Sequence, residues 1–255
     1  MSGLPLIIAH RGASRHAPEN TLAAIRLAIE TGADGIEIDL RLSKDGVPVV
    51  IHDADLTRTG RTDKKVRQLT ASELTNTDAG SWFDRKYPGR AGRSFAGETV
   101  PLLDDVLQLL IDFEGLLYLE LKCDERDTKP LVTAVCEQIE KSSLLPRIII
   151  KSFDLDAIRL VKQHTPNAQT AALFGPDMRY LFKRRRHLVD LACQHGADQV
   201  SVHRSLVTRG LVHAAASAEK PVVVWTVDDP RWLDKALKLK IAGLITNDPS
   251  RLLNR

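Results

Sequence analysis

Three carboxylates occur inside short apolar segments of this 255-residue chain, where a charged side chain is costly unless it has a partner. Glu37 and Asp39 are two residues apart, so both side chains project from the same face of an extended strand. Glu120 lies in a similar segment further along the chain. Carboxylates on one face repel each other, and a divalent cation removes that repulsion. An all-oxygen set of this kind selects a hard cation such as Mg²⁺ or Ca²⁺.

Two histidines and two cations end segments of the same kind. His10 is followed directly by Arg11, His52 closes another apolar run, and Lys122 lies two residues after Glu120. Arg11 can bind a phosphate through two hydrogen bonds, and Lys122 adds a point charge. With a divalent cation on the carboxylates, the group carries a net positive charge, which favours an anionic substrate. His10 and His52 can serve as an acid–base pair across the reacting atom.

Each of these features alone also has an ordinary structural explanation. A single histidine after a strand is more often a cap or a solvent-facing residue than a catalyst. Glu37 and Asp39 could lie on the outer face of an edge strand, and Glu120 with Lys122 could form a surface ion pair. These explanations require independent coincidences at several strand ends, so a common site is the better interpretation.

The elements that must position these residues are short apolar runs alternating with amphipathic segments, a pattern typical of parallel βα units. Several of the runs are continuously apolar, as expected of strands buried on both faces. Strands are predicted at Leu6–Ala9, Gly35–Leu40, Pro48–His52, Leu117–Leu121, Ile148–Ser152, Thr170–Phe174, Gln199–His203, Val222–Thr226 and Gly243–Thr246. Helices are predicted at Thr21–Glu30 with Asn20 as its N-cap, and at Leu102–Ile111, Thr128–Lys141, Leu155–His164, Leu188–His195, Leu206–Ala218 and Pro230–Leu239.

The predicted fold is an α/β protein, a (β/α)8 TIM barrel that occupies residues 1–255 as a single domain. Nine strands are one more than the barrel needs. The surplus lies at 35–52, where two runs are separated by a Ser-Lys-Asp-Gly turn that is too short for a parallel crossover. The chain must therefore turn back antiparallel before Val47, or one run lies off the barrel. A doubly wound open sheet is the alternative, although no Gly-x-Gly-x-x-Gly loop follows the first strand.

The stretch between His52 and Leu117 is longer than one βαβ unit requires. One predicted helix accounts for its end, and residues 54–100 remain as an insertion. Long insertions in barrels usually follow a strand at the active-site face, so we expect this one to form a small cap beside the site. It contains three aromatic residues, Trp82, Phe83 and Tyr87.

The composition narrows the function classes. The formal net charge is +3, far below that of a dedicated nucleic-acid binder, and the one dense basic run, at 183–187, lacks interleaved aromatic residues. Three cysteines at wide spacing form neither a disulfide framework nor a zinc motif, and the expected location is cytoplasmic. No apolar run is long enough for a signal peptide or a membrane span. We expect a small-molecule substrate, without nucleic acid or stable membrane insertion.

At these same positions the sequence resembles the glycerophosphodiester phosphodiesterase family. The resemblance runs from the first predicted strand to the last, and its first half, from His10 to His52, is the most specific part. The matching segments are His10–Gly12, Pro18–Thr21, Gly35–Leu40, Lys44–Asp53, Leu119–Lys122, Ser152–Asp154, Val224–Val227 and Ile245–Pro249.

The resemblance implies a barrel that hydrolyses glycerophosphodiesters to sn-glycerol 3-phosphate and an alcohol. It implies Mg²⁺ or Ca²⁺ as the cofactor, and the roles that it assigns fall into three groups. The catalytic pair would be His10 and His52, the metal ligands would be Glu37, Asp39 and Glu120, and the substrate contacts would be Arg11, Lys122 and Trp225.

Several points stay open at this level. The same machinery could act on lysophospholipids in a lysophospholipase D-type reaction, if the insertion's aromatic residues line a channel for an acyl chain. A non-catalytic barrel that binds phosphorylated ligands has no need of two histidines. A sugar-phosphate isomerase or aldolase, with Lys122 or Lys151 as the reactive lysine, leaves the paired carboxylates without a purpose. The headgroup, the choice of metal, the nucleophile, which histidine is the acid, the oligomeric state and the role of His203 are undetermined.

Overall fold

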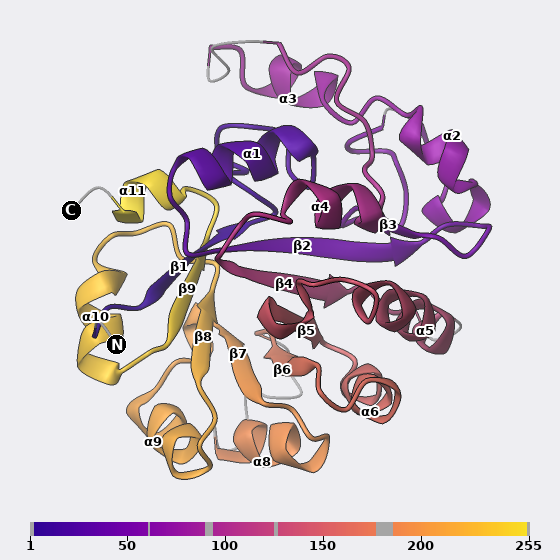
Figure 1. The fold of residues 1–255 in the computed structure, drawn as a ribbon. Coiled ribbons are helices and arrows are strands. Elements are labelled where there is room, and N and C mark those ends of the chain that lie inside the picture. Colours follow the sequence, from indigo (N-terminus) through magenta and orange to yellow (C-terminus); the bar gives the residue numbers. More distant parts are fainter. Residues whose placement is uncertain (1–2, 61, 90–93, 125–126, 177–185, 254–255) are drawn as a thin grey trace.

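A computed structural model describes residues 3–60, 62–89, 94–124, 127–176 and 186–253. Eight parallel strands form a closed ring, in which β1 pairs with β9 on one side and with β2 on the other (Figure 1). This confirms the predicted barrel. Its strands are β1 (Leu6–His10), β2 (Gly35–Leu42), β4 (Leu116–Leu121), β5 (Ile148–Ser152), β6 (Gln169–Phe174), β7 (Gln199–His203), β8 (Val222–Trp225) and β9 (Gly243–Thr246).

The surplus strand, β3 (Pro48–Val50), lies outside the ring and pairs antiparallel with the end of β2. The turn between them closes through a hydrogen bond from the Ser43 amide to the Val47 carbonyl. Gly46 has a φ of 79°, a conformation that glycine adopts without a steric penalty. The expected reversal before Val47 is therefore confirmed, and it returns the chain along β2, where the Ile51 amide bonds to the Asp39 carbonyl at 2.9 Å directly before His52.

Helices surround the barrel, and most of the apolar core lies between them and the outer faces of the strands. They are α1 (Leu22–Glu30), α4 (Leu103–Leu109), α5 (Thr128–Ile139), α6 (Leu155–His164), α8 (Arg186–Gln194), α9 (Arg209–Ser217), α10 (Trp232–Leu239) and α11 (Pro249–Leu253), with the 3₁₀ turns η2 (Leu145–Arg147) and η3 (Arg204–Leu206). A smaller apolar group that includes Ile8, Tyr118 and Ile245 fills the barrel interior. The basic run predicted at 183–187 lies largely outside the described residues, and its last two residues begin α8.

The N-cap of α1 differs from the prediction. Thr21, not Asn20, is the cap, and its side chain accepts a hydrogen bond from the Ala24 amide. Asn20 has a left-handed backbone with a φ of 59°, and its side chain is buried. Its amide donates to Asp39 at 2.8 Å and its carbonyl accepts from the Asp39 backbone. The conformation of Asn20 is therefore fixed by its contact with Asp39 in β2, which the local helix propensity of the sequence does not reveal.

The stretch 54–100 contains η1 (Val66–Gln68), α2 (Ala71–Thr75) and α3 (Ser81–Lys86), and Figure 1 shows α2 and α3 outside the ring of strands. It has two small apolar cores. One packs against Val49 and Ile51, at and directly after β3, and the other places Trp82 and Phe83 against the alanines of α1. These two aromatic side chains are therefore buried in packing and do not line an acyl-chain channel.

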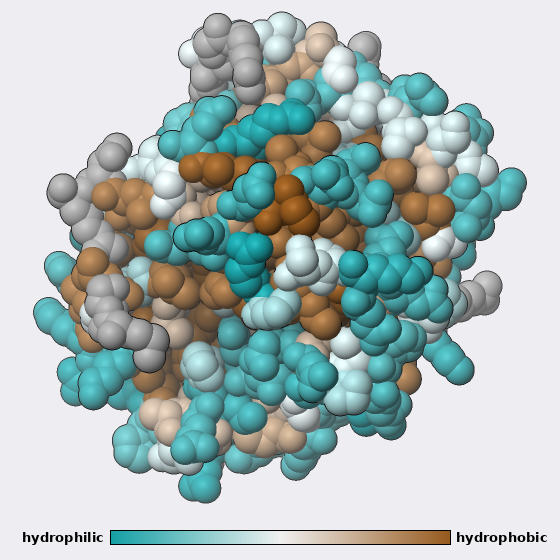
Figure 2. Space-filling model, viewed as in Figure 1, coloured by the Kyte–Doolittle hydropathy of each residue, from teal (hydrophilic) through white to brown (hydrophobic). Residues whose placement is uncertain are grey.

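Within the described part of the chain, no helix is both long and apolar enough to cross a membrane. On the face shown in Figure 2, hydrophilic residues are interspersed among the hydrophobic ones. The three cysteines are free thiols, of which Cys136 is buried in the core of α5.

Candidate active site

The three predicted carboxylates meet at the carboxyl ends of β2 and β4. Side chains alternate along β2, so Ile36 and Ile38 enter the outer core while Glu37 and Asp39 face inward. On β4, Glu120 is the register partner of Asp39. One oxygen from each of the three carboxylates lies within 4.8 Å of the other two, and all three residues are buried. This all-oxygen cluster is compatible with a divalent metal site.

Two lysines contact the carboxylate cluster. Lys122 Nζ is 3.1 Å from Asp39 Oδ1 and also forms a short contact with Glu120. Lys151, on β5, is 2% exposed and places Nζ 2.7 Å from Glu37 Oε1 and 3.2 Å from Glu120 Oε2. From the sequence, Lys151 was named only as the reactive lysine of an alternative aldolase. Its contact with the carboxylates was not predicted, because the apolar residues around Lys151 do not show which way its side chain points. Its place directly before the matching segment at 152–154 was the available signal.

Neighbouring cations keep Asp39 and Glu37 ionised. Burial alone disfavours the charge of Asp39, but Arg11 and Lys122 outweigh it and hold the pKa of this carboxyl well below its usual range. Burial likewise opposes the charge of Glu37, and Lys151 lowers the pKa of that carboxyl. Charged oxygens are the form that binds a hard cation, and a bound cation would take over part of the role of the two ammonium groups.

His10 ends β1 at the edge of the cluster. Its Nδ1 lies 2.7 Å from the side-chain oxygen of Asn247, and its Nε2 lies 4.0 Å from Glu37. The Asn247 amide nitrogen donates to Asp228, a carboxylate that can only accept, so the Asn247 oxygen faces the histidine. His10 therefore carries its proton on Nδ1 and leaves Nε2 free to accept one. Burial, followed by the charge of Arg11, lowers the pKa of His10 and favours this neutral form.

Arg11 has a left-handed backbone with a φ of 57°, and its amide donates to Glu37 at 3.1 Å. The next residue, Gly12, also has a positive φ, and a Cβ there would lie 2.5 Å from the carbonyl carbon of Ala24. The turn after β1 thus requires glycine, and it directs Arg11 back across the cluster. Its Nε is 3.0 Å from Asp39, and its Nη1 is 2.7 Å from Glu19.

His52 follows β3 and belongs to a chain of ion pairs. Its Nδ1 is 2.6 Å from Asp53, and Asp53 accepts from Arg58 at 2.6 Å. Arg58, from the stretch 54–100, also forms two 2.8 Å hydrogen bonds with Glu19. Glu19 in turn pairs with Arg11, so the network joins the two histidine-bearing strand ends. Sequence reasoning did not find Asp53 or Arg58 as partners, although both lie within six residues of His52.

Trp225 ends β8, which is separated from β2 by β1 and β9 in the barrel ring. Its ring packs edge-on against Phe153 at 5.6 Å and against His203 at 5.1 Å, between ring centroids. The Nδ1 of His203 lies 2.8 Å from the Ser205 hydroxyl, which holds the imidazole ring against Trp225. Among the described residues, the Trp225 Nε1 has no hydrogen-bond partner. The structure thus brings His10, Arg11 and the carboxylates together, and Trp225 connects to them through Phe153, whose ring centroid lies 6.0 Å from Lys122 Nζ.

A parallel barrel with buried ionisable groups at its strand ends has the architecture of an enzyme. The model of the glycerophosphoryl diester phosphodiesterase family matches residues 10–251. The chain belongs to this family of phosphodiesterases.

Similar proteins cover almost the whole chain. A glycerophosphodiester phosphodiesterase of Caldanaerobacter subterraneus subsp. tengcongensis is 32% identical, over 98% of this chain and 96% of its own length. One from Bacillus subtilis is 35% identical over 96% of this chain and 84% of its own. A phosphodiesterase from Oleispira antarctica, solved in complex with the product sn-glycerol-3-phosphate, has a TM-score of 0.85 at 27% identity, covering 99% of this chain and 97% of that one.

Proposed function

We propose that this phosphodiesterase hydrolyses glycerophosphodiesters to sn-glycerol 3-phosphate and an alcohol, with His10 and His52 as the acid–base pair. The observation that carries the proposal is the position of these histidines. His10 ends β1 with Nε2 4.0 Å from Glu37, and His52 follows β3 directly after Ile51, whose amide bonds to the Asp39 carbonyl at 2.9 Å. The sn-glycerol-3-phosphate bound by the Oleispira antarctica relative supports the product assignment.

His10 serves as the general base. Asn247 accepts its Nδ1 proton, and the lowered pKa keeps the ring neutral, so the lone pair on Nε2 is available for the proton of the attacking hydroxyl. Asp228 orients Asn247 through two hydrogen bonds, which makes Asp228 and Asn247 positioning residues for His10.

His52 then serves as the general acid. Its 2.6 Å contact with Asp53 fixes the orientation of the ring, in the way that a carboxylate orients a catalytic histidine elsewhere. The ring donates a proton to the leaving alkoxide, which is too basic to depart unaided. Arg58 holds Asp53 in place, so the stretch 54–100 contributes a supporting residue to the site, as a cap would.

Arg11 and Lys122 hold the substrate phosphate, because their charges face the inner side of the strand ends. Glu37, Asp39 and Glu120 would hold a divalent cation, Mg²⁺ or Ca²⁺, which when bound neutralises the charge of the phosphodiester. Trp225 offers an apolar surface for the carbon skeleton of the glycerol half.

The test is release of glycerol 3-phosphate from glycerophosphocholine and glycerophosphoethanolamine, first with EDTA and then with added Mg²⁺ or Ca²⁺. We expect EDTA to abolish release and a metal to restore it. Release that persists in EDTA would contradict the metal site. A lack of release with any metal, from these two diesters and also from glycerophosphoserine and glycerophosphoinositol, would contradict the proposed reaction.

A further inference from the structure

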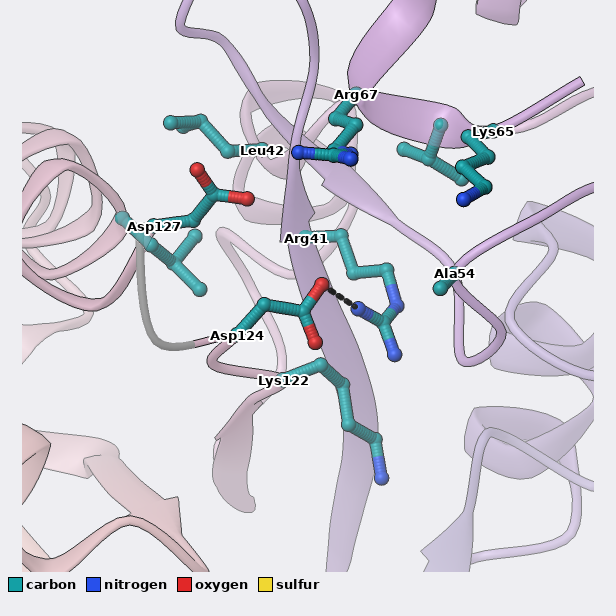
Figure 3. A pocket seen from close by; sticks show the side chains of 10 residues that line it. Arg41, Leu42, Ala54, Lys65, Arg67, Lys122, Asp124 and Asp127 are labelled. Carbon is teal, nitrogen blue, oxygen red and sulfur yellow. Dashed lines mark hydrogen bonds and ion pairs between the residues drawn. The ribbon is translucent and has the colours of Figure 1, made fainter.

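A cavity of about 310 Å³ opens beside the carboxylate cluster, between the end of β2, the start of α5 and the 3₁₀ turn η1. Figure 3 shows Arg41 and Lys122 from the strand ends on one side and Lys65 and Arg67 from η1 and its cap on the other. Its volume is at the lower end for a small-molecule site. The lining residues are Arg41, Leu42, Ala54, Lys65, Val66, Arg67, Lys122, Asp124, Asp127 and Leu131.

The cavity is positively charged, because four cationic side chains face two carboxylates. Arg41 and Lys122 are largely buried, with side chains 16% and 13% exposed. The nearest ion pair of Arg41, to Asp124, is a long 3.5 Å contact. In the described parts of the chain, no carboxylate lies within 4.0 Å of the charged groups of Lys65 and Arg67, although both are exposed. Lys122 already pairs with Asp39 and Glu120, so the cations available to an anion in this recess are Lys65, Arg67 and the loosely paired Arg41.

The cavity adjoins the proposed reaction centre at two points. Lys122 lines it and also contacts Asp39 and Glu120 in the cluster. Arg41 lines it and donates from Nε to the backbone carbonyl of His52 at 2.8 Å. If His52 protonates the leaving alkoxide, the alcohol half of the substrate lies on this side of the phosphate. Trp225, at the end of β8, does not line this cavity, so its aromatic surface is available to the uncharged glycerol half.

We propose that this cavity is a subsite for an anionic group on the alcohol half, so that the preferred substrates are glycerophosphodiesters whose alcohol bears a carboxylate or a phosphate. This rests on the proposed function and specifies its substrate class. A choline or ethanolamine ammonium entering the same recess would meet like charges, which disfavours these headgroups.

Two matched pairs of substrates test the proposal. Glycerophosphoserine differs from glycerophosphoethanolamine by one carboxylate, and glycerophosphoinositol phosphate differs from glycerophosphoinositol by one phosphate. At low ionic strength we expect kcat/KM to favour the anionic member of each pair by about 5- to 30-fold, the sum of a few partly exposed charge pairs. The preference should fall as salt screens the pocket.

The variant for this test is Lys65→Glu with Arg67→Glu, which reverses two exposed charges of the cavity. The expected result is loss or inversion of the preference within each pair. The matched control, Lys238→Glu with Lys240→Glu, reverses two exposed charges at the end of α10, which leads into β9 at the opposite end of the barrel. The control should keep the wild-type ratios.

Hydrolysis of all four diesters with equal kcat/KM values, or with the same ratios in wild type and cavity variant, would overturn the subsite and leave the proposed reaction intact. A lack of hydrolysis of every diester would overturn the proposed reaction and the subsite with it.

Discussion

At the scale of single residues, Lys151 is the least expected member of the site. It is almost fully buried, and its ammonium bridges Glu37 and Glu120, two of the three carboxylates that would bind a cation. A buried lysine keeps its charge only where such partners compensate its desolvation, and the two carboxylates raise the pKa of Lys151 despite its burial. Lys151 and a divalent cation therefore compete for the same oxygens.

The Lys151→Met variant tests this competition. Without metal, we expect the protein to lose about 3–5 kcal/mol of stability, because like charges remain buried without their partner. Added Ca²⁺ or Mg²⁺ should raise its melting temperature more than it raises that of the wild type, since the cation no longer has to replace an ammonium group. Lys162→Met, which breaks a partly exposed pair with Asp198, is the control. An identical metal-induced shift in all three proteins would contradict the competition.

The proposed division of roles between the histidines leads to a second prediction. His10→Ala and His52→Ala should each lower kcat by about 10²–10⁴-fold while leaving the fold intact. A glycerophosphodiester with 4-nitrophenol as its alcohol needs no proton on the leaving group. This substrate should restore much of the activity of His52→Ala and little of that of His10→Ala. Measuring kcat for each variant on both substrates, with melting temperatures as the folding control, tests which histidine is the acid. Wild-type turnover of a natural diester by folded His52→Ala would contradict the assignment.

Much of the site was predictable from residue type and position. The carboxylates and Arg11, Lys122 and His10 were found because a polar side chain at the end of a buried strand is costly unless it faces a partner or a site. Asn247 and Asp53 were not assigned roles, and Lys151 was considered only as the reactive lysine of an aldolase. Each is defined by a contact across the barrel or by the direction of one side chain, and a single sequence contains neither.

At the scale of elements, the turn after β1 is tied to the last helix by Asp248. Its carboxylate is 3.2 Å from Arg15 and 3.1 Å from His16, and it also accepts from Ser250 and the Arg251 amide at the start of α11. Burial opposes the charge of Asp248, but the hydrogen bonds from Ser250 and His16 lower the pKa of this carboxyl below its ordinary value. One side chain thus fixes both the loop that carries Arg11 and the cap of α11.

Asp248→Asn should destabilise the protein by about 1 kcal/mol at neutral pH, because the amide keeps the shape and loses the charge-assisted bonds. A depressed folded pKa means that the charged form contributes stability above the unfolded value of about 3.9 and loses it as the pH falls. The difference between variant and wild type should therefore shrink below about pH 4. Urea unfolding at several pH values measures it, and a difference that grows towards acid would contradict this account.

The elements themselves were largely predictable. Continuous apolar runs gave all eight barrel strands within about two residues, and the short turn at 43–46 gave the antiparallel reversal. The errors have physical causes. The segment predicted as a helix at 206–218 is divided into η3 and α9, because Thr208 caps the helix anew. The short helices α2 and α3 went unpredicted, since their stability comes from packing on β3 and α1.

At the scale of the whole molecule, closure of the ring makes the two ends of the chain interdependent. β1 begins at Leu6 and pairs with β9 and β2 at once, so the first strand is an interior strand and not an edge. The residues near a chain end usually open locally, unless they are held in a sheet. Here β1 carries His10, and the loop after β9 carries Asn247, so opening of this seam would separate the proposed base from its partner.

We therefore expect amide hydrogen exchange in β1 and β9 to be as slow as in β5, on the far side of the ring, with all three strands exchanging only through global unfolding. The amides of α2, in the stretch outside the ring, should exchange faster, because that helix has five residues, of which only Leu74 is buried. Mass spectrometry of peptides covering these segments makes the comparison. Faster exchange in β1 than in β5 would show that the barrel opens at its first strand without unfolding, and that the pairing of His10 with Asn247 depends on an equilibrium separate from the stability of the fold.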